Sequence, residues 1–78
     1  MARYYFNIEN GRHIDDDEGS DLPDLAAVRR LALRTMGELL REGCEQDEPH
    51  RGLTMHILDE DNVEVMTVRV MVEEASAG

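Results

Sequence analysis

Residues 22–43, LPDLAAVRRLALRTMGELLREG, carry the longest sustained helical pattern of the chain. Their apolar residues at helical spacing predict one buried stripe: Leu25, Val28, Ala32, Met36 and Leu39. Pro23 suits a first helical turn, Asp21 or Asp24 can cap the helix, and Gly43 is placed to end it as a left-handed cap. We therefore expect one helix over residues 23–42.

The segment before the helix predicts a hairpin and a loop. Residues 3–9, RYYFNIE, alternate with period two, which places Tyr4, Phe6 and Ile8 on one face of a strand. Asn10-Gly11 suits a type I′ turn, so residues 12–15 should return as an edge strand. Residues 15–21, DDDEGSD, then form an acidic loop that reverses at Gly19.

The segment after the helix predicts a second hairpin. Residues 53–58, LTMHIL, and residues 63–72, VEVMTVRVMV, read as strands. The turn between them, residues 59–62, ends in Asn62, which tolerates positive φ. In the last strand Met66, Val68, Val70 and Val72 share one face, while Val65, Thr67, Arg69 and Met71 share the other.

These elements predict an α+β fold of order ββαββ, with one helix packed on one face of a four-stranded sheet. Two strand arrangements remain open. A right-handed crossover gives the order 2-1-4-3, which is β-grasp-like, and the alternative is a fully antiparallel sheet. Residues 1–74 form a single domain, and residues 75–78 are expected to be a frayed tail.

Composition excludes several classes of protein. The chain has 78 residues and a net charge of -10, which argues against binding to nucleic acid. An apolar content of 41% is too high for a disordered acidic tail, and no apolar run is long enough to span a membrane. The first residues lack a signal-peptide core, and a single cysteine cannot form an internal disulfide. We expect a cytoplasmic protein.

Several weak motifs together resemble a known family. They are the opening Arg3-Tyr4-Tyr5-Phe6, the acidic loop with Gly19, the Leu22-Pro23-Asp24 step with the following alanines, and the hairpin on residues 59–61 before a valine-rich strand. The whole chain resembles a family of short bacterial domains of unknown function, mostly alphaproteobacterial. The resemblance supports these element boundaries and implies no activity, cofactor or catalytic residue.

The sheet face without a helix is the strongest candidate for a binding surface. An apolar face left open on so acidic a protein is typical of an interface. The alternative is a half-polar antiparallel face left in water. The candidate interface residues are Tyr5, His56, Leu58, Val65, Thr67 and Met71.

The helix offers a second candidate surface. Arg30, Arg34 and Arg41 gather on the side opposite the buried stripe and would suit an acidic partner segment or a phosphate. The alternative is a solvated face on which Arg34 pairs with Glu38.

The acidic loop is a candidate cation site, with Asp15, Asp17 and Asp21 as weak candidate ligands. The loop lacks EF-hand spacing, and a solvated loop is the alternative. The histidines and Cys44 show no zinc-ligand spacing, and the acids around Cys44 argue against a reactive thiolate. We expect no cofactor and no catalysis.

These observations favour a small acidic interaction module that binds itself, as a homodimer, or a protein partner through the helix-free sheet face. The alternative is a metal-binding regulatory module that uses residues 15–21. A third hypothesis, a nucleic-acid mimic, rests on the net charge alone.

Overall fold

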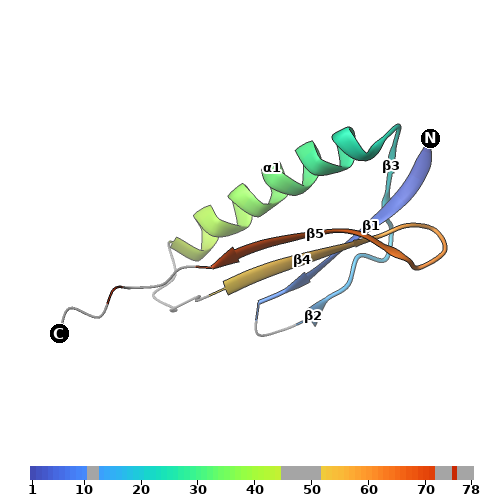
Figure 1. Ribbon diagram of the computed structural model, residues 1–78. Coiled ribbons are helices and arrows are strands. Elements are labelled where there is room, and N and C mark those ends of the chain that lie inside the picture. The colour runs from blue at the N-terminus through green and yellow to red at the C-terminus, as the bar shows by residue number, and fades with distance from the viewer. Residues whose placement is uncertain (11–12, 45–51, 72–74, 76–78) are drawn as a thin grey trace.

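The computed structural model describes residues 1–10, 13–44, 52–71 and 75, with only the backbone of residues 43–44. Figure 1 shows α1 lying along one face of a twisted sheet. This arrangement confirms the α+β class, with one helix and a five-stranded antiparallel sheet. The elements are β1 (Ala2–Glu9), β2 (His13–Ile14), β3 (Ser20–Leu22), α1 (Leu25–Cys44), β4 (Gly52–Leu58) and β5 (Glu64–Met71).

The sheet has the order β2-β1-β4-β5, and β3 pairs with the other half of the same edge of β1 that β2 occupies. Every pairing is antiparallel, so the fully antiparallel alternative is confirmed. The expected order 2-1-4-3 is wrong, because the third expected strand, now β4, and not the fourth, now β5, pairs with β1. β4 runs opposite to β1 and pairs with it directly, without a parallel crossover.

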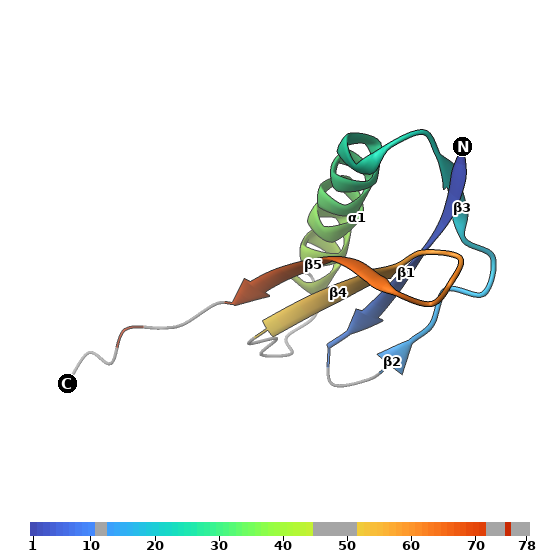
Figure 2. The same ribbon diagram turned by 45° about the vertical axis from the view of Figure 1, so that its right-hand side comes forward.

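The return from β1 is broken into two short strands. The expected strand over residues 12–15 is reduced to His13–Ile14, and the expected loop over residues 15–21 ends in β3. Gly19 adopts φ +75°, which turns the chain back toward β1 so that Ser20–Leu22 can pair with it. Figure 2 shows β2 and β3 along β1 at different heights. Gly11 of the expected type I′ turn lies outside the described residues.

The core lies between α1 and the central strands. Helix residues Val28, Ala32 and Met36 pack against Phe6 and the inward side chains of β4, which are buried: Leu53, Met55 and Ile57. The helical stripe is therefore confirmed except at its first residue. Leu25 is 49% exposed because it begins the helix, ahead of the turns that cross the sheet.

Side-chain oxygens cap the start of α1. Asp24 Oδ1 accepts a hydrogen bond from the N–H of Ala27 at 2.8 Å, and the Asp24 carbonyl accepts one from Val28 at 3.2 Å. Asp24 is thus the N-cap residue, and Pro23 precedes it rather than opening the helix. At the other end the helix runs through Gly43 to Cys44, so the expected stop at Gly43 is wrong by two residues.

A β-bulge changes which residues of β5 face the helix. The register pairs Ile57 with Met66 and then Leu58 with Glu64, so Val65 is an extra residue. Val65 packs against the core beside Met66, and Glu64 takes its place on the helix-free face. The expectation that Val65 lies on the helix-free face is therefore wrong, because strict period two does not hold across a bulge.

Two glycines give opposite predictions for alanine substitution. A Cβ at Gly37, in the exposed middle of α1, would have no atom within 4 Å, so Gly37→Ala should raise the free energy of unfolding by about 0.5–1 kcal/mol. A Cβ at Gly19 would lie 2.9 Å from Arg3 Cγ and from Tyr5 Cε1, at a positive φ. Gly19→Ala should therefore lower the same quantity by about 2 kcal/mol or more. Urea unfolding of both variants checks this, and equal effects would contradict the fold.

Candidate functional site

The middle of β1 has a gap in its strand pairing. On one edge β3 pairs with residues 2–4 and β2 pairs with residues 8–9, which leaves Phe6 without a strand partner there. The carboxylate of Asp16 fills this gap: its Oδ2 accepts the N–H of Phe6 at 3.1 Å. In return the N–H of Asp16 donates to the side-chain oxygen of Asn7 at 2.9 Å. The acidic loop is therefore held against β1 by hydrogen bonds.

The second oxygen of Asp16 organises the loop itself. Its Oδ1 accepts the N–H groups of Glu18 at 3.2 Å and of Gly19 at 3.0 Å. Partial burial raises the pKa of Asp16, but the hydrogen bonds from Gly19, Phe6 and Glu18 outweigh burial and hold the pKa below its ordinary value. Asp16 is thus an anion held by three backbone donors.

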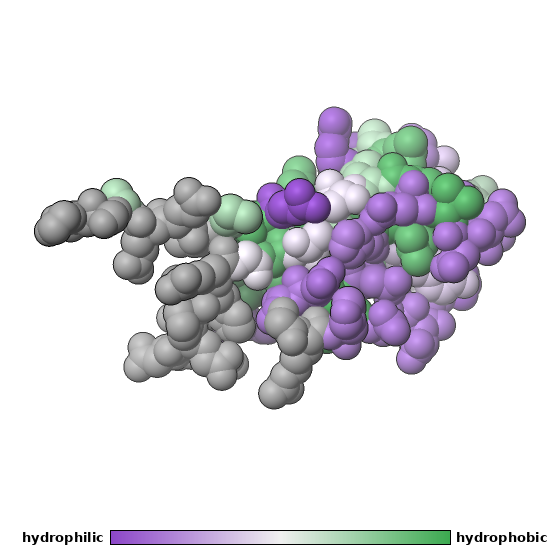
Figure 3. All heavy atoms as spheres, turned by 60° about the horizontal axis from the view of Figure 1, so that its bottom comes forward, coloured by the Kyte–Doolittle hydropathy of each residue, from purple (hydrophilic) through white to green (hydrophobic). Residues whose placement is uncertain are grey.

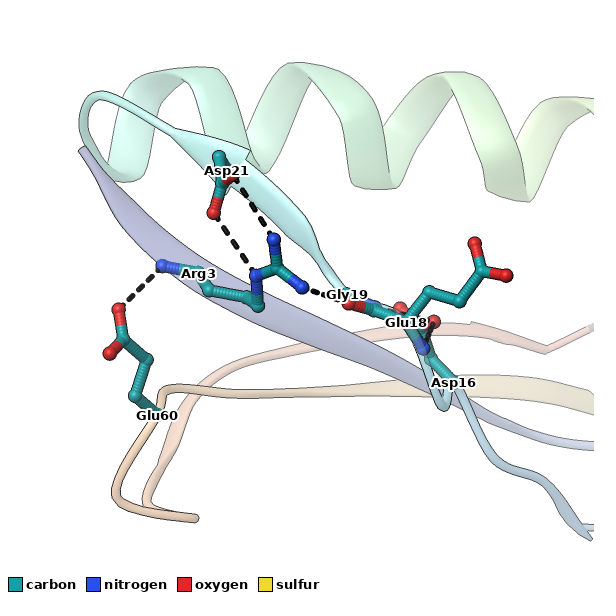
Figure 4. A network of polar contacts seen from close by, with 6 residues as sticks. All are labelled: Arg3, Asp16, Glu18, Gly19, Asp21 and Glu60. Atoms are coloured by element: carbon teal, nitrogen blue, oxygen red, sulfur yellow. Dashed lines mark hydrogen bonds and ion pairs between the residues drawn. The ribbon is translucent and has the colours of Figure 1, made fainter.

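Arg3 on β1 bonds to the acidic loop on both sides of Gly19, at Glu18 and at Asp21 (Figure 4). Its guanidinium donates to both carboxylate oxygens of Asp21, at 3.2 and 3.3 Å, and to the carbonyl of Glu18 at 2.8 Å. The Arg3 guanidinium lowers the pKa of Asp21 below its ordinary value, and Asp21 raises that of Arg3. Because both side chains are half exposed, this pair orients the loop more than it stabilises the fold.

The turn between β4 and β5 meets the same end of β1. Glu60 Oε1 accepts the backbone N–H of Arg3 at 2.9 Å, beyond the last β1–β4 pair, Tyr5 with Leu58. Asp59 Oδ1 accepts the N–H groups of Asp61 at 2.8 Å and of Val63 at 3.0 Å, which shapes the turn. Asn62 has φ +64°, which confirms its expected left-handed conformation.

These two segments surround a shallow depression of about 290 Å³ at one end of the helix-free face. Tyr5 and Leu58, directly opposite each other on β1 and β4, form its less polar part. The other lining residues are polar. Four are acids, Asp15, Asp16, Asp59 and Glu60, and two are amides, Asn7 and Asn62. We call this site the acidic depression. With no base in its lining, it favours a cationic group.

His56 occupies the centre of the helix-free face. Its Nδ1 contacts Glu64 of β5, and its Nε2 lies 3.4 Å from Glu9 Oε2 of β1. Hydrogen bonding to Glu64 outweighs desolvation and, together with Glu9, raises the pKa of His56. The same contact lowers the pKa of Glu64. When it is protonated, His56 on β4 therefore forms ion pairs with Glu9 on β1 and Glu64 on β5.

The candidate interface residues do not form one patch. Tyr5 and Leu58 meet at the acidic depression, His56 and Thr67 are cross-strand neighbours in the middle, and Met71 lies opposite Gly52 at the far end. The view from below the sheet in Figure 3 shows hydrophilic residues across most of this face, with hydrophobic residues mainly toward the right. The face is more polar than expected because Glu64 replaces Val65 on it.

The three arginines of the candidate basic helix face, Arg30, Arg34 and Arg41, are all exposed on α1. In the part of the chain that the structure describes, none of them forms an ion pair. The Arg34–Glu38 pair that belonged to the alternative of a solvated face is therefore absent there.

The three weak metal candidates have separate environments. Asp15 lines the acidic depression, Asp17 is exposed, and Asp21 pairs with Arg3. Across the described residues no group of three His, Cys, Asp or Glu side chains is arranged to hold a metal ion. His50 and the side chain of Cys44 lie outside the described part. Among those same residues, no helix combines the length and apolar character needed to cross a membrane.

Three residues around the acidic depression were not predicted as site residues from the sequence: Arg3, Asp16 and Glu60. Arg3 could have been found, because an isolated base in an acidic amino-terminal segment indicates an ion pair. Asp16 and Glu60 carry none, because neighbouring acids share their chemistry and only the fold selects which carboxylate reaches β1.

Removing the Asp16 carboxylate should destabilise the protein. Asp16→Ala leaves the N–H of Phe6 without its acceptor and is expected to lower the free energy of unfolding by about 2 kcal/mol at neutral pH. Because the pKa of Asp16 is lowered in the folded state, its contribution is present above the ordinary pKa and is lost as pH falls through the folded value. Urea unfolding at neutral and acidic pH measures both effects. Asp17→Ala, the control, should change stability by less than about 0.5 kcal/mol.

His56 should make stability depend on pH in the opposite direction. A raised pKa means that its contribution is complete below the ordinary pKa of histidine and is lost as pH rises through the folded value. The stability difference between the wild type and His56→Gln should therefore shrink from mildly acidic to mildly alkaline pH. Thermal melts across this range check the expectation. A difference that is constant with pH would contradict the contacts with Glu64 and Glu9.

Comparison with known proteins gives a family but no activity. No match was found to a curated protein or to a solved structure. Residues 3–71 match the family model described as a domain of unknown function, DUF6894. They include all but the first residue of β1, the acidic loop, α1 and both strands of the second hairpin. The chain therefore belongs to the DUF6894 family.

Proposed function

We propose that this domain is a non-catalytic protein-interaction module that binds a protein partner through the helix-free face of its sheet. The observation that carries the proposal is the acidic depression, where the Tyr5–Leu58 pair lies open beside four acids. No element of the described chain covers this face, since α1 lies on the other side of the sheet.

The chemistry of the acidic depression suits a basic side chain of the partner. Among the described residues the side chain of Asp15 makes no hydrogen bond, and Glu60 accepts one only through Oε1. These groups can receive a guanidinium or ammonium group, and the ring of Tyr5 offers it an aromatic surface. A shallow site of this size suits one side-chain head group.

The depression is held in place before a partner arrives. Asp16 and Arg3 fix the acidic loop, and Asp59 fixes the turn, through hydrogen bonds to backbone groups on both sides. A site that is already ordered loses less conformational entropy on binding. This ordering favours recognition over a role as a merely solvated loop.

Family membership extends the proposal to related chains. We propose that the opening Arg3–Phe6 strand and the Leu22-Pro23-Asp24 step mark the family, and that its members are bacterial and mostly alphaproteobacterial. The two motifs have structural roles that support this proposal: Arg3 holds the acidic loop through Asp21, and Asp24 caps α1.

A titration with N-acetyl-arginine amide tests the proposal. We expect saturable NMR shifts confined to the amides of Tyr5, Asn7, Asp15 and Leu58, with a Kd of about 1 mM or weaker for a single side chain. The neutral isostere N-acetyl-citrulline amide should cause none of these shifts.

Two variants with the same charge change provide the control. Asp15→Lys alters the lining of the depression and should abolish the shifts, whereas Asp17→Lys alters the same loop outside the lining and should preserve them. Shifts that spread evenly over all acidic residues, or that survive Asp15→Lys, would contradict the proposed site.

A further inference from the structure

The outer edge of β5 is an unpaired strand edge in the described structure, since β5 ends the order β2-β1-β4-β5. It is eight residues long, EVMTVRVM, and contains four β-branched residues. It has no proline or lysine, residues that usually protect an edge from pairing with another chain. Its bulge at Val65, a second protective feature, lies near its start and leaves residues 66–71 in regular pairing. The edge of β1 differs, because Asp16 occupies its gap.

The hydrogen bond at Phe6 shows which groups face outward on β5. Phe6 donates away from β4, so its partner Ile57 directs its N–H toward β5. Along β4 the same direction holds for Met55 and Leu53, whose partners on β5 are Val68 and Val70. The N–H and C=O groups of Thr67, Arg69 and Met71 must then point outward, away from β4.

We propose that two copies of this chain pair antiparallel along β5, about a two-fold axis at Thr67. The axis stands perpendicular to the sheet, so the two sheets become continuous and both helices lie on one face. This inference goes beyond the proposed function and does not depend on it, because it uses the strand edge and leaves the acidic depression open.

Charge favours this register. With Thr67 opposite Thr67 of the second copy, Arg69 lies beside the bulge of the second copy, within reach of its Glu64. This contact occurs twice by symmetry. A register shifted to centre on Arg69 would instead oppose two like charges, which is unfavourable.

Light scattering across a wide range of protein concentration tests the pairing. The wild type should approach twice the monomer mass, and Arg69→Glu should raise the dimer dissociation constant by roughly tenfold, since two attractive contacts become repulsive. Arg34→Glu makes the same charge change on the exposed side of α1 and should leave the dissociation constant unchanged. A wild type that stays monomeric throughout overturns the proposal.

Proline substitutions separate the outer edge from the ladder. Thr67→Pro removes an outward N–H and should yield a folded monomer, whereas Val68→Pro removes an N–H directed at β4 and should unfold the hairpin. Circular dichroism reports the fold. A folded Thr67→Pro that remains dimeric overturns the proposal, and if Thr67→Pro does not fold, Arg69→Glu decides.

Cysteine cross-linking tests the register in a Cys44→Ser background. Thr67→Cys places two thiols opposite each other and should form a disulfide-linked dimer. Arg69→Cys places them about 13 Å apart along the strands, too far to bridge, and should not. Cross-linking at position 69 but not at position 67 overturns the Thr67-centred register.

Discussion

The hydrogen bond from the backbone of Phe6 to the carboxylate of Asp16 is the constraint on which much of this structure depends. β1 is bonded on both edges, but the strands beside it leave two positions unmet, at Phe6 and at Arg3. A buried N–H group without a partner is costly, and Asp16 supplies the acceptor for the one at Phe6. Glu60 supplies the acceptor for the more exposed N–H group of Arg3. An acid of the acidic loop and an acid of the β4–β5 turn thus complete the hydrogen bonding of β1, in addition to giving the protein negative charge.

This constraint links the acidic depression to the edge of β5. By holding residues 15–19 against β1, Asp16 builds one wall of the acidic depression, and by filling the gap it closes that edge to other strands. The direction of the same hydrogen bond sets the alternation of donors across β4 and β5. The described part of the molecule therefore presents a preformed acidic site on one face and an unpaired edge on one strand. These are the two surfaces through which we propose that it associates.

Local chemistry made much of the fold predictable from the sequence. The helical spacing of Val28, Ala32 and Met36, the period of β1 and β4, and the positive φ of Gly19 and Asn62 all follow from short-range rules. The strand order did not follow, because β4 and β5 both show apolar alternation and either fits beside β1. Val65 was misplaced because a bulge depends on how the turn joins both strands. Asp16 was indistinguishable from its acidic neighbours, since only the fold brings one of them to the gap in β1.

Residue-by-residue amide hydrogen exchange at neutral pH measures the hydrogen bond between Phe6 and Asp16 directly. The N–H of Phe6 should exchange as slowly as the β-ladder amides of β1, although no strand pairs with it on that edge. In Asp16→Ala this amide alone among its strand neighbours should lose most of its protection while the β1–β4 ladder keeps its own. Rapid exchange of Phe6 in the wild type, at the rate of an exposed loop amide, would show that Asp16 does not complete the edge of β1.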